Sequence, residues 1–251
     1  MTVILPQINS PTYQIELPVS KIKLKIRPFM AREEKILLMA MENKSVKIDE
    51  IKSAILQIIT NCVVGMKLDV DMLPSVDIEY IFMQLRKRSV GETIELAYDL
   101  RETFECATEK CPETYNVKIK IDDIKLKSSE NIKRIIKLND TIGVVLKPMS
   151  FATSMQIAEN SKINESEKMF EFIACMVTDI FDGDNVIDTK TLPKADLLTW
   201  IETSFSHQAL EETLKYINEL PYFSSDINVE CKQCGKTKTM DIKGMVDFFT
   251  F

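Results

Sequence analysis

The sequence predicts an α+β fold made of two pseudo-symmetric repeats, at residues 1–127 and 128–251. Three observations carry this prediction. Two similar apolar-alternating segments open the two halves, helical periodicity follows each of them, and each half ends near a pair of cysteines. Each repeat is therefore expected to contain a β-hairpin, two or three helices and a terminal cysteine knuckle.

The opening segments are IELPVSKIKLKIRP at 15–28 and IIKLNDTIGVVLKP at 135–148. Both alternate apolar and polar residues around a short polar step, and both end in a basic residue followed by proline. Strict alternation is typical of half-buried strands, and the polar step is typical of a turn. Each segment is predicted to form a two-stranded hairpin.

Helical patterns follow each hairpin, because apolar residues recur there at steps of three and four. The predicted helices are 31–43 and 49–64 in the first half, and 151–160 and 166–181 in the second.

A further helix in each half is predicted from a Leu-Pro step. Leu73-Pro74 precedes Asp77, and Leu192-Pro193 precedes Asp196, each at the same spacing. Proline suits the first turn of a helix, and an acidic residue there faces the positive end of the helix dipole. The two steps lie at closely similar distances after their hairpins, which supports the repeat.

The cysteine pairs predict a metal site. Cys106 and Cys111 stand near the end of the first half, and Cys231 and Cys234 near the end of the second, where Gly235 permits a tight turn. Each pair lies between strand-like segments, so two knuckle-like hairpins are expected. Four thiolates would close a structural zinc site of zinc-ribbon type that joins the two halves, within one chain or between chains.

Three alternatives to this site remain open. In the first alternative, Cys106 and Cys111 are ordinary turn residues. In the second, the cysteines hold an iron–sulfur cluster, which their spacing disfavours. A redox dithiol at Cys231 is disfavoured because no strand-to-helix junction surrounds it. Cys62 and Cys175 fall on apolar helix faces and are assigned to the core.

Composition argues against several classes of function. The net charge of −6 opposes a sequence-independent hold on nucleic acid, and Arg86-Lys87-Arg88 is better placed at the end of a helix. No apolar run of membrane-spanning length and no signal peptide are found, so we expect a cytoplasmic location without membrane insertion. The single histidine, His207, is expected in the first turn of a helix, and no catalytic motif or small-molecule site is found.

The arrangement resembles the baseplate hub assembly proteins of T4-type contractile-tailed bacteriophages. The resemblance rests on the opening IELPVSKIKLKIRPFMAREEK, the two LP-x-x-D helix starts and the late knuckle INVECKQCGK. It implies a non-enzymatic scaffold or chaperone that contacts other hub proteins in the host cytoplasm during assembly, with or without a place in the finished virion tail. It leaves the oligomeric state open.

Two other functions are compatible with the sequence. A zinc-ribbon regulator that binds nucleic acid is suggested by Lys232, Lys236 and Lys238 around the second knuckle, although no aromatic residues stand between them. The second is an enzyme that uses His207, which the sequence allows but no motif indicates. The methionines are mainly assigned to the core, with Met39, Met41, Met149 and Met155 as candidates for a partner surface.

Overall fold

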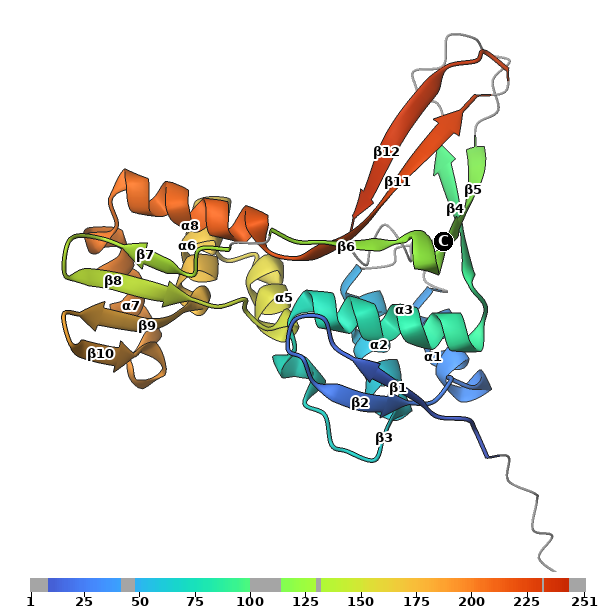
Figure 1. Ribbon diagram of the computed structural model, residues 1–251, viewed down its shortest axis with the longest axis horizontal. Coiled ribbons are helices and arrows are strands. Elements are labelled where there is room, and N and C mark those ends of the chain that lie inside the picture. The colour runs from blue at the N-terminus through green and yellow to red at the C-terminus, as the bar shows by residue number, and fades with distance from the viewer. Residues whose placement is uncertain (1–8, 42–47, 100–113, 130–131, 232, 244–251) are drawn as a thin grey trace, which may run out of the picture. The chain divides into compact units, whose positions relative to one another are not determined.

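The computed structural model describes residues 9–41, 48–99, 114–129, 132–231 and 233–243 (Figure 1). Helices and several small antiparallel sheets occur together, which confirms the predicted α+β class. The helices are α1 (Ala31–Met41), α2 (Ile48–Cys62), α3 (Ser75–Ser89), α5 (Phe151–Glu159), α6 (Glu165–Met176), α7 (Lys194–Ser204) and α8 (His207–Glu219). No helix among the described residues is both long enough and apolar enough to cross a membrane.

Within the described residues, the strands pair into four antiparallel groups. The first-half strands are β1 (Tyr13–Glu16), β2 (Lys23–Ile26), β3 (Val63–Val64), β4 (Thr93–Asp99), β5 (Thr114–Lys120) and β6 (Lys125–Lys127). The second-half strands are β7 (Ile135–Lys137), β8 (Ile142–Leu146), β9 (Val177–Asp182), β10 (Asn185–Asp188), β11 (Tyr222–Glu230) and β12 (Thr237–Lys243).

The chain divides into two compact units. The first contains residues 1–70, 76–127 and 222–251, and the second contains 71–75 and 128–221. One break between the two units falls after Lys127. The C-terminal hairpin, however, packs with the first unit, because β11 pairs with β6. The compact units therefore differ from the linear repeats 1–127 and 128–251, and the repeat itself stays a prediction.

The first unit contains a sheet of order β1-β2-β3, the hairpin β4-β5 and a sheet of order β12-β11-β6. Its core is formed by the apolar faces of these strands together with α2 and α3. The buried members include Leu24, Ile26, Ile55, Ile59, Ile78, Ile81 and Phe82.

The turn between β1 and β2 is held by a helix far along the chain. Asp77, in the first turn of α3, is fully buried, and its carboxylate oxygens accept hydrogen bonds of 2.9 Å from the backbone N–H groups of Val19 and Ser20. Lys21 in the same turn adopts φ 59°. The acidic residue predicted at this helix start therefore pairs with a turn as well as facing the helix dipole.

The second unit contains a four-stranded sheet of order β10-β9-β8-β7. Side chains on one face of this sheet pack against α6, α7 and α8. The buried cluster comprises Ile136, Val144, Leu146, Ile173, Ala174, Met176, Val177, Ile180, Leu197, Ile201, Ala209 and Tyr216. Helix α6 begins with a reciprocal capping box between Asn164 and Glu167, and Ser206 caps α8.

The predicted elements are largely confirmed, with errors at two helix ends. The helix predicted at 49–64 ends at Cys62, and Val63–Val64 form β3. Both opening hairpins form, and helices begin directly after the two Leu-Pro steps. The helix predicted at 166–181 ends at Met176, and Val177–Asp182 continues as β9. The reason is tertiary, because β9 satisfies its backbone groups by pairing with both β8 and β10.

Candidate functional site

Cys231 and residues 233–236 lie at the tip of the β11–β12 hairpin, where two backbone hydrogen bonds close a tight turn. The backbone N–H of Gly235 donates to the carbonyl of Cys231 at 2.8 Å, and that of Cys231 donates to the carbonyl of Lys236 at 2.8 Å. Gly235 adopts φ 68°, a left-handed conformation that glycine reaches without steric cost. The tight turn expected beside Cys231 and Cys234 is therefore present, and the metal site there stays a prediction.

Apolar side chains surround this turn. Cys231 is fully buried and forms a small cluster with Val229, against which Cys234, Ile227 and Met240 pack. Val117 of β5 also packs against the cluster, so the hairpin β4-β5 lies beside the β11–β12 hairpin (Figure 1). The segment that carries Cys106 and Cys111 connects β4 to β5.

Cys106 and Cys111 themselves lie outside the described residues. Within the part of the chain that is described, no group of three or more His, Cys, Asp or Glu side chains is arranged to hold a metal. The structure thus places two of the four predicted ligands in one turn. The other two, Cys106 and Cys111, directly precede β5 in the chain. Val117 of β5 packs beside the turn that carries Cys231 and Cys234.

A second feature is the apolar surface of α1. Ile36, Leu37, Leu38, Met39 and Ala40 are consecutive, and none of them is buried. Leu38 is 56% exposed and Met39 is 60% exposed. A helix that is apolar on all sides is normally covered by other protein, so this surface is unusual for a helix in contact with water.

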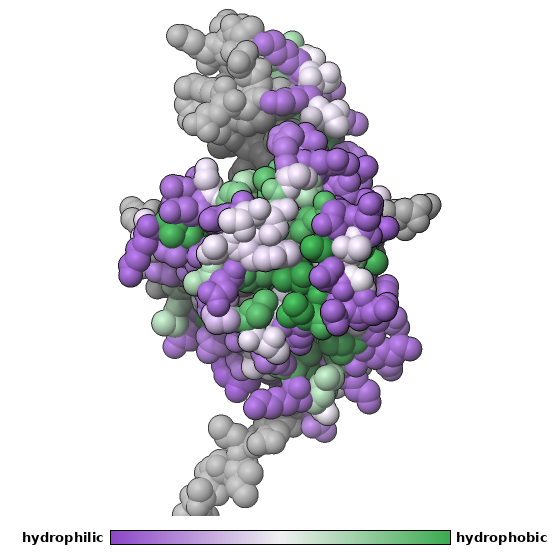
Figure 2. Space-filling view, turned by 90° about the vertical axis from the view of Figure 1, so that its left-hand side faces the viewer, coloured by the Kyte–Doolittle hydropathy of each residue, from purple (hydrophilic) through white to green (hydrophobic). Residues whose placement is uncertain are grey.

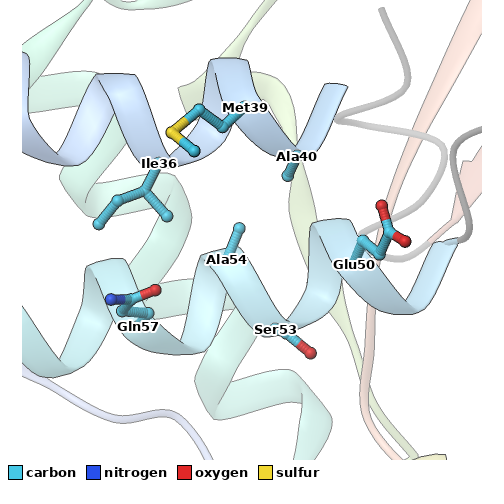
Figure 3. Close-up of a pocket in the computed structure, with 7 residues that line it drawn as sticks. All are labelled: Ile36, Met39, Ala40, Glu50, Ser53, Ala54 and Gln57. Atoms are coloured by element: carbon cyan, nitrogen blue, oxygen red, sulfur yellow. The ribbon is translucent and has the colours of Figure 1, made fainter. Parts of the chain in front are cut away.

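A groove of about 630 Å³ runs between α1 and α2 (Figure 3). Ile36 and Ala40 of α1 and Ala54 of α2 point toward one another across it. Glu50, Ser53 and Gln57 of α2 also line the groove and supply polar groups along one wall. A groove with an apolar floor and polar groups on one side is the kind of surface that receives an amphipathic helix.

The first turn of α1 is anchored by a buried carboxylate. Glu33 is fully buried, and its carboxylate accepts from both the Arg27 and Arg32 guanidinium groups at 2.8 to 3.3 Å and from the N–H of Met30 at 3.0 Å. Burial opposes ionisation, but the Arg27 hydrogen bond, with those from Met30 and Arg32, outweighs it and lowers the pKa of Glu33 to about 2. Helix α1 is thus fixed at its start by charge while its second half presents apolar side chains.

A comparison with known protein families matched residues 10–250 to the family described as T4 bacteriophage base plate protein. The chain belongs to this family. The match covers nearly the whole of this base plate protein, and it confirms the resemblance to T4-type phage base plate proteins. Searches of curated proteins and of solved structures found no match.

Other predicted positions in this base plate protein have clear outcomes. His207 is the first residue of α8 and lies 3.4 Å from Glu211 at the surface. Cys62 is fully buried, as predicted, and burial raises the pKa of its thiol to about 11. Arg86, Lys87 and Arg88 occupy the last turn of α3, as predicted, and Lys87 pairs with Asp122 at 2.6 Å.

Sequence reasoning underestimated α1 of this base plate protein. Met39 and Met41 were named as partner-surface candidates, but Leu38 and the groove beside α2 were not recognised. The available signal was the unbroken run ILLMAM at 36–41, since an amphipathic surface helix interrupts its apolar residues every two or three positions.

Proposed function

We propose that this chain assists assembly of the central hub of the phage base plate by binding other hub proteins, without enzymatic activity. In this proposal, the protein acts in the host cytoplasm during assembly. Any copy that stays in the finished virion lies in the tail. Membership in the base plate family supports a role among phage tail proteins. The observation that carries the proposal is the exposed apolar run of α1.

The anchored start of α1 supports a recognition role for its second half. Glu33, Arg27 and Arg32 hold the first turn by charge-assisted hydrogen bonds, which are stronger than neutral ones. The exposed Leu38 and Met39 then project from a helix whose position is already fixed. Binding would therefore cost little free energy for ordering this helix. Methionine adapts readily to an apolar partner surface.

The proposed occupant of the α1–α2 groove is an amphipathic helix of another hub protein. Such a helix would place its apolar side chains against Ile36, Met39 and Ala54 and its polar face toward solvent. Glu50 and Gln57 would meet the polar border of the incoming helix.

The test is co-purification of the other hub proteins of the same phage, co-expressed with the tagged chain. The double variant Leu38→Lys and Met39→Lys should reduce recovery of a bound hub protein at least tenfold, with circular dichroism unchanged. Val90→Lys is the matched control, because Val90 is 58% exposed and lies outside α1. Equal recovery by wild type and the double variant, or equal loss with Val90→Lys, would contradict the proposal.

We also propose that Cys106, Cys111, Cys231 and Cys234 bind one structural zinc that joins the two halves of the chain. The tight Cys231–Cys234 turn and the packing of Val117 beside it support this arrangement. Thiolates are suited to zinc, and a closed four-thiolate site contributes folding free energy without an open position for substrate.

Native mass spectrometry of the reduced, folded chain tests the zinc site. One zinc per chain is expected, and both Cys106→Ser and Cys231→Ser should lose it and lower the melting temperature. Cys175→Ser should retain it, since Cys175 lies in α6. Folded wild-type chain without metal, or zinc retained by Cys106→Ser, would overturn the shared site.

A further inference from the structure

The geometry points to a second binding surface: we infer that the outer edge of β10 pairs with an extended, basic and apolar segment of a partner protein. This surface lies in the second unit and does not depend on the α1 groove or on the zinc site. Figure 2 looks toward the end of this unit where its hairpin turns lie and shows hydrophobic side chains gathered at the surface among hydrophilic ones.

Strand β10 forms one edge of the described sheet. It pairs with β9 through a two-residue turn, in which Gly183 has φ 57°, and pairs with no other described strand. The Gly183 N–H donates to the Thr141 carbonyl, on the β8 side of β9. Along β9, the backbone groups of alternate residues therefore point toward β8 and toward β10. In an antiparallel ladder this alternation turns the N–H and C=O groups of Val186 away from β9. An incoming strand would meet backbone groups that are able to pair.

The outer face of the sheet next to this edge is apolar. Val186 is 67% exposed and stands opposite Phe181, which in turn stands opposite Gly143. The Phe181 ring lies across Gly143, where an added Cβ would be 2.3 Å from Cζ of the ring. Val145 and the 48% exposed Ile135 continue the apolar surface toward β7. The opposite face is the one covered by α6, α7 and α8.

Carboxylates surround the same edge. Asp179 and Asp188 stand directly opposite each other across β9 and β10, and Asp182 and Asp184 flank the turn. Like charges placed opposite each other destabilise a sheet. None of these four carboxylates takes part in an ion pair among the described residues.

The net negative charge of the second unit favours a basic partner. The second unit contains sixteen acidic and nine basic residues, so it carries the negative charge of the chain. A second copy paired through β10 would bring another four carboxylates to the same edge. A strand with Lys or Arg side chains would instead neutralise Asp179 and Asp188 while its apolar residues cover Val186 and Phe181.

The probe is a capped synthetic peptide of alternating lysine and valine, with an alternating glutamate and valine peptide for comparison. Binding to the full chain is followed by fluorescence anisotropy and by backbone amide chemical shifts. The lysine peptide should bind at least tenfold more tightly than the glutamate peptide, weaken with added salt, and shift the amides of Val186 and Asp188. Equal binding of both peptides, or shifts confined to other elements, would overturn the proposal.

Two variants separate strand pairing from charge. Val186→Pro removes the outward N–H without breaking the β9 ladder and should abolish binding. If the proline variant fails to fold, Val186→Ser, which removes the apolar contact without adding charge, should weaken binding at least tenfold. The pair Asp179→Asn and Asp188→Asn should weaken binding at least tenfold.

The control pair Asp196→Asn and Glu202→Gln removes equal charge from α7 of the same unit and should change affinity less than twofold. Equal losses in both pairs would assign the binding to general charge and refute the edge. A dimer of the wild-type chain that Val186→Pro dissociates, seen by analytical ultracentrifugation, would replace the proposed partner with a second copy.

Discussion

Asp77 accepts a hydrogen bond of 2.9 Å from the backbone N–H of Val19, which lies 58 residues earlier in the chain. The same buried carboxylate accepts from the N–H of Ser20, so one side chain binds two successive N–H groups of the β1–β2 turn. Asp196 occupies the matching place after the second Leu-Pro step, but it is exposed. The β7–β8 turn is held by its own Asn139, whose side chain accepts from the N–H groups of Thr141 and Ile142.

Asp77→Ala should therefore lower the free energy of unfolding by about 2 kcal/mol, because two partly buried hydrogen bonds to a charged acceptor are lost. Asp196→Ala, the matched control, should change it by less than about 0.5 kcal/mol. Urea denaturation measures both. Equal losses in the two variants would show that the helix dipole, and not the turn, explains the effect at Asp77.

Lys21 adopts a left-handed backbone conformation in the turn that Asp77 holds. Lys21→Gly should raise the free energy of unfolding by about 0.5 to 1 kcal/mol, since only glycine adopts this conformation without strain. Ser20→Gly, at a neighbouring position without positive φ, should lower it. Thermal melts of the two variants are expected to shift in opposite directions, and shifts of the same sign would refute the strain.

Glu33 links the stability of the first unit to pH. Its pKa is lowered from the ordinary value of 4.5 to about 2, so its contribution is complete above pH 4.5 and disappears as pH falls toward 2. Glu33→Gln should cost about 3 kcal/mol at neutral pH, because two arginines lose their buried counter-charge.

The same variant should flatten the loss of stability between pH 4.5 and 2. Glu34→Gln in the same helical turn is the control, since Glu34 is exposed and should leave the pH profile unchanged. A pH profile of Glu33→Gln with the wild-type slope would contradict the assignment.

Glycine is required at position 143 because the Phe181 ring and the Ile136 backbone approach it closely. A Cβ at this position would lie 2.3 Å from the Phe181 ring and 2.6 Å from the Ile136 carbonyl oxygen. Gly143→Ala should lower the free energy of unfolding by about 1 to 3 kcal/mol. Adding Phe181→Leu should recover only part of this loss, because the contact with the Ile136 backbone remains. Full recovery in the double variant would assign the whole clash to the ring.

Elements whose causes are local could be predicted from the amino-acid sequence. Alternation placed both opening hairpins, Leu-Pro followed by aspartate placed the starts of α3 and α7, and Gly235 placed the Cys231–Cys234 turn. These features depend on backbone preferences and on residues only a few positions apart.

Features that depend on partners distant in the chain follow from the tertiary structure. It ended α6 at Met176 because the next residues pair with β8 and β10, and it placed the C-terminal hairpin in the first unit through β6. It also buried Glu33 between two arginines and left Leu38 exposed. The same composition permits burial or exposure of these side chains, and the choice is made by long-range packing that no local pattern encodes.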